Sequence, residues 1–228
     1  MKRTLLAVLV GTAPWTSSLV LAQEDSTFDR FIHCALGLGV DLQAAPSIID
    51  YINTLVSPPI GSRLTNFSSA TEFFIAPEAR MTRDLSVAVE YTYFLKSYSL
   101  SDVSGFSSWN FSYTVQMPTL LVHYVVPGTG YWLKFGGGAG YAAATFTQKN
   151  TGAGSEQDYH AKGGTIVADA VADTEFDPHF FGNIGFEMRY CYAGNLTNSA
   201  GAQPAYASTR ARMDYFSVGA RFGVLFQL

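Results

Sequence analysis

At the end of the chain, in residues 216–228, every second residue is apolar, and the residues between them are small or polar except Leu225. Successive side chains of a β-strand point to opposite faces, so this pattern predicts a strand with one apolar face. The segment is longer than the usual strand of about five or six residues. A tilted strand needs about 9–11 residues to cross a bilayer, so the length is typical of a transmembrane strand. The apolar positions are Phe216, Val218, Ala220, Phe222, Val224, Phe226 and Leu228.

The same two-residue period recurs along most of the chain. In one segment, 109–126, the apolar phase changes near Met117 and Pro118. We expect a β-bulge there, because proline cannot donate to the hydrogen-bond ladder. A further segment, 160–176, alternates weakly but brings the strand count to an even eight. The other alternating segments are 34–42, 72–81, 85–96, 131–146 and 180–192.

The connections between these segments alternate between short and long. Short turns on one side and longer loops on the other are typical of an outer-membrane barrel, in which the short turns are periplasmic. The first long loop contains a helical pattern at residues 47–56, followed by two prolines that end it. The short connections are 81–84, 127–130 and 177–178, and the long ones lie near 43–70, 98–107, 147–162 and 193–209.

The N-terminal segment, residues 1–22, has the composition of a secretory signal peptide. It begins with two basic residues, continues with a short apolar run and ends at Ala22. The alternative is a membrane anchor, but the apolar run is interrupted well before the roughly 20 residues that a spanning helix needs, at Gly11, Thr12, Pro14, Ser17 and Ser18. We therefore expect cleavage after Ala22, which leaves residues 23–228 as one β-barrel domain.

The chain is 48% apolar and only 14% charged, with a mean hydropathy of +0.12. Its few charged strand residues fall on the face opposite the apolar one, so we expect them inside the barrel. An eight-stranded barrel is just wide enough for its own side chains to fill. The charges then either form a structural plug or line a narrow conduit. Four of them, Glu78, Arg80, Glu90 and Lys96, lie on neighbouring predicted strands and are expected to be neighbours in the barrel. The inward charges are Glu78, Arg80, Glu90, Lys96, Lys134, Glu187, Arg189 and Arg221.

Aromatic residues gather near the ends of the predicted strands. Two aromatic girdles are expected where a membrane barrel meets the bilayer interfaces. A secreted soluble barrel with its apolar face around an apolar ligand is the alternative, since alternation alone fits both. The girdle residues are Tyr91, Tyr93, Trp109, Phe111, Tyr113, Tyr131, Tyr190, Tyr192 and Phe226.

Three features occur together: the signal peptide, the final strand FSVGARFGVLFQL, and the stretch YTVQMPTLLVHYVVPGTGYWLKFGGGAGYAAATF. In this combination the chain resembles the small eight-stranded outer-membrane β-barrel proteins of Gram-negative bacteria, which are OmpA/OmpX/OmpW-like. The resemblance implies an all-β, antiparallel up-and-down transmembrane barrel in the outer membrane. It also implies contact with outer-membrane lipid and lipopolysaccharide, and recognition by the barrel-insertion machinery through Phe222, Val224, Phe226 and Leu228. The family usually ends in Phe, whereas this chain ends in Leu228.

We predict no catalytic, cofactor or metal site. A net charge of −4 and a pI near 5.5 argue against a nucleic-acid partner, which would require a basic face. Barrel hydrolases need a Ser–His pair with a third polar group, and no histidine here stands in a His-x-Ser pair; the four are His33, His123, His160 and His179. We therefore expect a structural or surface-interaction role, in which the loops bind a surface ligand, with a narrow channel for small or hydrophobic solutes as the alternative.

Overall fold

The computed structural model describes residues 32–56, 63–101, 108–177 and 179–227. The predicted signal peptide and Leu228 lie outside the described residues. Strands make up most of the described chain, and the single helix among these residues, α1, spans Pro46–Leu55. The long strands are β1 (Ile32–Ala44), β2 (Phe67–Thr82), β3 (Leu85–Ser101), β4 (Ser108–Gly128), β5 (Tyr131–Asn150), β6 (Ser155–Asp177), β7 (Phe180–Asn195) and β10 (Arg212–Gln227).

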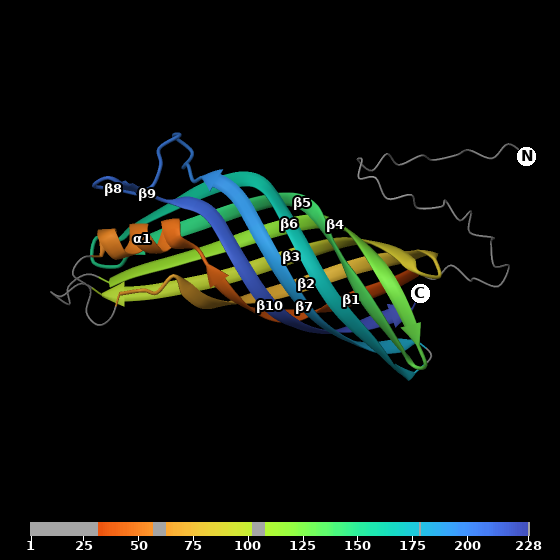
Figure 1. Ribbon diagram of the computed structural model, residues 1–228. Helices are drawn as coiled ribbons and strands as arrows, with labels where there is room; N and C mark the ends of the chain where they lie inside the picture. The colour runs from red at the N-terminus through yellow and green to blue at the C-terminus, as the bar shows by residue number, and fades with distance from the viewer. Residues whose placement is uncertain (1–31, 57–62, 102–107, 178, 228) are drawn as a thin grey trace, which may run out of the picture.

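These eight strands close into an antiparallel barrel in the order β1-β10-β7-β6-β5-β4-β3-β2, which confirms the predicted fold class (Figure 1). The first and last strands close the ring, with His33 opposite Gln227. Helix α1 and a small hairpin of β8 (Ala205–Tyr206) and β9 (Thr209–Arg210) lie at the end of the barrel opposite the C-terminus (Figure 1). No helix among the described residues is long and apolar enough to span a membrane.

The apolar face of the strands points outward over most of the barrel. Phe186 and Phe222 are 65% and 53% exposed, whereas Arg189 and Arg221 are 0% and 4% exposed. A soluble barrel would show the reverse, with its apolar face inside and its charges in water. The exposed belt therefore excludes the soluble alternative, and a closed ring leaves no unpaired strand edge to be buried in lipid.

Strand β4 contains no bulge, so that prediction was wrong. Its pairing with β3 runs without a shift through Pro118, and residues 116 and 119 keep the same register with β5. The apolar residues instead change face within a regular strand. Val115 and Met117 point inward and are fully buried, whereas Leu120 and Val122 point outward and are exposed. This change of face marks the level at which the strand leaves the apolar belt.

The prediction of a long loop at 147–162 is also wrong, because most of that segment belongs to strands. Strands β5 and β6 pair continuously out to Asn150 and Ser155 and are joined by a tight hairpin. Beyond the apolar belt their outward residues are polar, as at Thr147 and Lys162, and alternation between apolar and polar faces is therefore weak there. The weakest predicted strand, 160–176, is part of β6.

The predicted helix is present as α1, and it packs against the inner face of the barrel end. Its Ile48, Ile49, Tyr51 and Ile52 are at most 2% exposed and join a cluster of apolar residues contributed by the surrounding strands. At this end the barrel resembles a soluble protein, with a polar exterior and an apolar interior. The strand residues of this cluster include Phe94, Tyr98, Leu100, Phe111, Tyr113, Val115, Met117, Phe146, Tyr159, Met213 and Tyr215.

Candidate functional site

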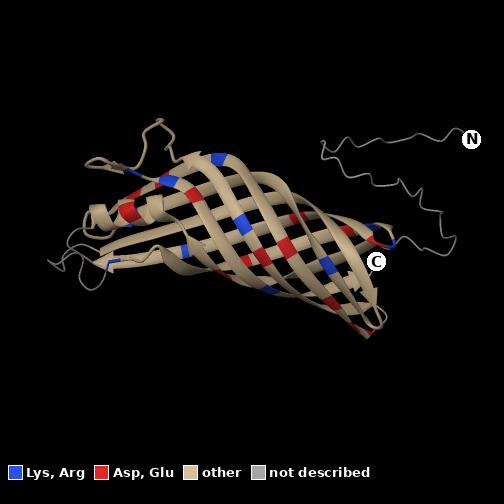
Figure 2. Ribbon diagram, in the orientation of Figure 1, with Lys and Arg blue, Asp and Glu red and all other residues tan. Residues whose placement is uncertain are grey.

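The middle of the barrel holds a buried group of charged residues, here called the central layer (Figure 2). Arg189 of β7 is its most connected member. Its guanidinium contacts both oxygens of Glu187, at 3.1 Å from Nε and 3.0 Å from Nη2, and Glu90 Oε1 at 2.8 Å. Charge-assisted bidentate contacts of this kind fix the geometry of both partners. The central layer comprises Asp41, Glu72, Glu90, Glu187, Arg189 and Arg221.

Arg221 of β10 links the remaining acidic groups. Its Nη1 lies 2.7 Å from Glu90 Oε2 and 3.1 Å from Glu187 Oε2, and its Nη2 lies 2.7 Å from Glu72 Oε1. Its guanidinium also stacks over the Phe74 ring at 4.0 Å from the centroid. The two arginines therefore connect three carboxylates from β2, β3 and β7 across the width of the barrel.

A second buried group, the lower layer, lies nearer the short turns. Lys134 Nζ lies 2.6 Å from Glu78 Oε2 and 2.8 Å from Asp173 Oδ2, and all three side chains are nearly inaccessible. His123 Nε2 lies 2.9 Å from Asp169 Oδ2 in the same region. A small cavity of about 30 Å³ separates the two layers, which is room for a water molecule or two but not for a solute.

Seven of the eight predicted inward charges are buried in the barrel, but the four expected neighbours do not form one network. Glu90 belongs to the central layer and Glu78 to the lower one. Arg80 stacks over Trp132 at 4.8 Å and donates to the backbone of Arg83. Lys96 is half-exposed and donates to the carbonyl of Ser69 instead of joining a carboxylate.

Four acidic residues of the interior were not predicted as site residues: Asp41, Glu72, Asp169 and Asp173. Each is on the inner face of its strand, and Asp41, Glu72 and Asp173 are fully buried. The alternation that identified the other charges also holds for Asp41 and Glu72, because each is next to an outward apolar residue. The alternation in β6 is too weak to show that Asp169 and Asp173 face inward.

Six of the nine predicted girdle residues are outside the barrel, and three are not. Tyr91, Tyr131, Tyr190 and Tyr192 are between 42% and 52% exposed on the outer surface, and Tyr93 and Phe226 are half-buried there. Trp109, Phe111 and Tyr113 are not girdle residues, because all three have inward positions on β4. Phe111 and Tyr113 are each 1% exposed, and Trp109 stacks on Phe111 at 6.0 Å. They pack against the buried face of α1 in the apolar interior of this barrel end, because β4 lies beyond the exposed apolar belt at this level.

Helix α1 is fixed to the barrel at several points. Ser47 Oγ accepts a 2.9 Å hydrogen bond from the Arg212 backbone and donates to the Arg210 carbonyl. Tyr51 OH donates to Gln148 Oε1 at 2.6 Å, and burial raises the pKa of the Tyr51 hydroxyl well above its usual range, so it stays a donor. These contacts join the first long connection to three strands.

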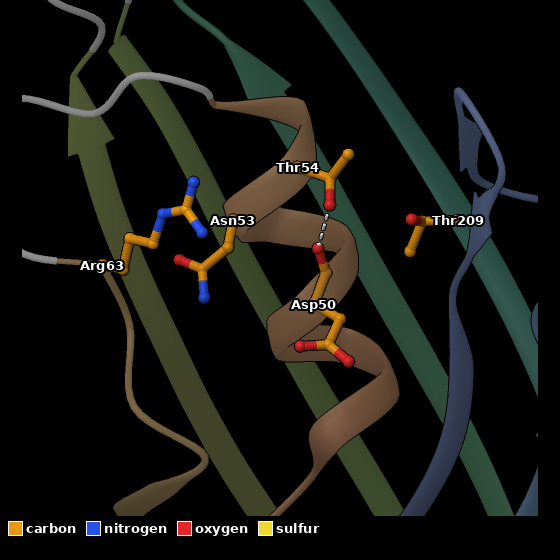
Figure 3. A pocket seen from close by; sticks show the side chains of 5 residues that line it. All are labelled: Asp50, Asn53, Thr54, Arg63 and Thr209. Atoms are coloured by element: carbon orange, nitrogen blue, oxygen red, sulfur yellow. Dashed lines mark hydrogen bonds between the residues drawn. The ribbon is translucent and has the colours of Figure 1, made fainter.

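A polar pocket of about 390 Å³ opens beside α1 (Figure 3). Asn53 and Arg63 lie on one side of the helix and Thr209 on the other, while Thr54 donates to the Asp50 carbonyl at 2.7 Å. Asn53 also exchanges hydrogen bonds of 2.9 and 3.0 Å with the Leu64 backbone, which holds the following segment against the helix. The pocket is thus a hollow in the surface of the barrel end.

One triad-like set of residue types lies inside the barrel. Ser86 is opposite His123 in the β3–β4 pairing, and His123 contacts Asp169. Ser86 Oγ and His123 Nδ1 form no hydrogen bond with one another, so the serine is not joined to the imidazole. Ser86 is also 0% exposed, which leaves no path for a substrate.

No protein-family model matches the sequence, and no curated protein matches it in sequence. Among solved structures, the chain is similar to Neisserial surface protein A, at 12% identity and a TM-score of 0.50, over 86% of this chain and 97% of that one. It is also similar to Ail, the attachment invasion locus protein of Yersinia pestis, at 10% identity and a TM-score of 0.48, over 88% and 100%.

A third match is the outer membrane protease OmpT from Escherichia coli, at 10% identity and a TM-score of 0.44, over 89% and 99%. At these identities the likeness concerns the fold alone. That fold is the one found in small outer-membrane β-barrel proteins.

Proposed function

We propose that the protein is an integral outer-membrane barrel with a closed interior, and that it acts through its outward-facing end rather than by conducting solutes. The proposal includes an export signal at residues 1–22 and a mature chain of 23–228. The observation that carries it is the distribution of side chains along the barrel: an apolar belt outside, two ionic layers inside, and a helix packed into the far end.

Closure of the interior is supported by burial at three successive levels. Lys134 and its two carboxylates cross the barrel at the lower layer, and Arg189 and Arg221 cross it at the central layer. At the end of the barrel away from the short turns, α1 fills the apolar interior, with Ile48 and Ile52 fully buried. A hydrated ion or small solute needs a continuous aqueous path, and the cavity between the ionic layers holds only about 30 Å³.

A role at the outward-facing end is supported by how far the barrel extends beyond its apolar belt. Strands β4 and β5 present Asn110, Thr114, Thr145 and Thr147 on their outer faces there, where no lipid tail would be in contact. We assign contacts with lipopolysaccharide and with a surface ligand to this polar rim and to the pocket beside α1. The exposed residues Phe222 and Val224 of β10 are the proposed contact with the insertion machinery, together with Phe226 and Leu228.

The proposal includes no catalytic activity. Ser86, His123 and Asp169 are enclosed by the barrel wall, and Ser86 has no bond to the histidine. A serine nucleophile requires a base within hydrogen-bond reach and an approach for its substrate. This region offers neither.

Planar-bilayer recording of the purified, refolded protein tests the closed interior. We expect a flat current trace at neutral pH, under conditions in which a porin of known conductance gives clear steps. Reproducible single-channel steps that depend on the amount of refolded protein would instead support the narrow channel. Fractionation of cells that express the full chain tests the location, which we expect to be the outer membrane, with a mature N-terminus at Gln23.

A further inference from the structure

Negative groups outnumber positive ones in the central layer. Its four carboxylates face two guanidinium groups, and all six side chains are at most 4% exposed. Glu72, Glu90 and Glu187 each contact at least one arginine, whereas Asp41 forms no ion pair with any described residue. The buried Lys134 is already held between Glu78 and Asp173 in the lower layer.

Asp41 is the unusual member of the layer. It is 0% exposed, and among the described residues its carboxyl group meets no hydrogen-bonding group other than the carboxyl group of Glu72. A buried carboxylate without a partner is strongly unfavourable, so such groups are paired, protonated or bound to a metal. The fold nevertheless leaves room for this one: a Cβ added at Gly219 would lie 2.2 Å from Asp41 Oδ1.

The carboxylates around Asp41 have the spacing of a cation site. One oxygen each from Asp41, Glu72 and Glu187 lie within 4.8 Å of one another. Ca²⁺ binds oxygen at about 2.3–2.6 Å, so ligands on opposite sides of one ion lie roughly 4.6–5.2 Å apart. Ser217 Oγ, on the inner face of β10 two positions from Gly219, is a further fully buried oxygen without a hydrogen-bond partner among the described residues.

We propose that the central layer holds one Ca²⁺ ion, bound by Asp41, Glu72 and Glu187. The two charges of the ion balance the two carboxylates in excess over the arginines. An all-oxygen site with three carboxylates suits a hard cation. Ca²⁺ fits better than Mg²⁺, which keeps several waters in a strict octahedron and would need more space than these enclosed side chains leave.

The test begins from unfolded protein, because all three ligands are closed from solvent and the ion must enter during folding. The full mature chain, unfolded in urea, is refolded into detergent micelles in buffer containing either Ca²⁺ or EDTA. After gel filtration in metal-free buffer, we expect about one calcium per protein by mass spectrometry of the metal. We also expect a higher thermal unfolding midpoint than in the sample refolded with EDTA.

Asp41→Asn is the matched variant, because it keeps the shape of the side chain and removes its charge without touching an arginine. We expect it to bind no calcium and to unfold at the same temperature after either refolding. Asp84→Asn, in an exposed turn at the end of the barrel, is the control and should retain both the calcium and the shift.

Two results would overturn the proposal. The first is wild-type protein that refolds in Ca²⁺ without retaining it and has the same midpoint as the EDTA sample, which would mean that protons balance the excess charge. The second is calcium that remains bound in Asp41→Asn. If Asp41→Asn does not fold, the metal content and the EDTA comparison of the wild type decide the matter alone. None of these outcomes depends on whether the barrel conducts.

Discussion

Replacing Arg189 by Met is expected to be among the most destabilising single substitutions in the barrel. The change removes a fully buried guanidinium that holds Glu187 through two contacts and Glu90 through one. Methionine keeps an apolar stem like that of arginine but lacks the guanidinium group, so the loss of charge compensation outweighs the loss of packing. The carboxylates would then be left with a single arginine in the central layer.

The expected loss in free energy of unfolding depends on the ion pairs that Arg221 still forms with the carboxylates. Breaking a buried ion pair by removing one partner costs about 3–5 kcal/mol, because the other charge stays buried. Arg221 still contacts Glu90 Oε2 at 2.7 Å and Glu187 Oε2 at 3.1 Å, so compensation is partly kept. We therefore expect the free energy of unfolding to fall by about 3 kcal/mol, the lower end of that range.

Equilibrium urea unfolding of the refolded protein in detergent measures this change. Tryptophan fluorescence is a suitable signal, because Trp132 stacks on Phe181 inside the barrel at 4.7 Å. The cost of Arg189→Met should be about 1–2 kcal/mol smaller in a Glu187→Gln background, since one uncompensated carboxylate is then absent.

Lys149→Met is the control for this series, because its pair with Glu156 is about half-exposed and contributes at most about 1 kcal/mol. If Arg189→Met unfolds within about 1 kcal/mol of the wild type, the central layer does not hold the barrel together as argued.

Four further outcomes follow from the same structure. Phe186→Lys, in the middle of the exposed belt, should lower the free energy of unfolding in lipid by about 2–4 kcal/mol, whereas Thr114→Lys, beyond the belt, should change it by at most about 1 kcal/mol. Ile52→Ala should cost about 2–5 kcal/mol by leaving a cavity under α1, measured by urea unfolding. Gly138→Ala should destabilise the barrel by about 1–3 kcal/mol, since the new Cβ would lie 1.8 Å from the Leu120 carbonyl oxygen. The folded protein should migrate differently in gel electrophoresis before and after boiling, and identical mobility would argue against a closed barrel.

The sequence predicted the fold because a two-residue period is a property of each strand alone. The outward face of β10 and the inward positions of Glu90 and Arg221 followed from that period. Which charges meet across the barrel did not follow, since it depends on the register of strands far apart in sequence. Glu90 and Arg189, for example, approach from opposite sides of the ring, on β3 and β7.

The change of environment along a strand is the second feature that the sequence pattern did not predict. Phe111 and Tyr113 have the same inward phase as Thr119 and His123, whereas the sequence pattern alone predicts a girdle followed by a bulge. A membrane barrel is apolar outside only within the bilayer, and beyond it the packing follows the rule of soluble proteins. The predicted helix in the first loop indicates this change, because an amphipathic helix needs an apolar surface on which to pack.

The direction of the apolar face along β4 is the central claim, and spin-label accessibility measures it most directly. Cys34 and Cys191 are free thiols and are first replaced by serine, after which single labels are placed at outward positions. In lipid vesicles we expect labels at Leu120 and Val122 to be relaxed by oxygen and protected from a water-soluble nickel complex, and a label at Thr114 to show the reverse. Labels at Leu120 and Val122 that the nickel complex reaches as readily as it reaches Thr114 would contradict the account.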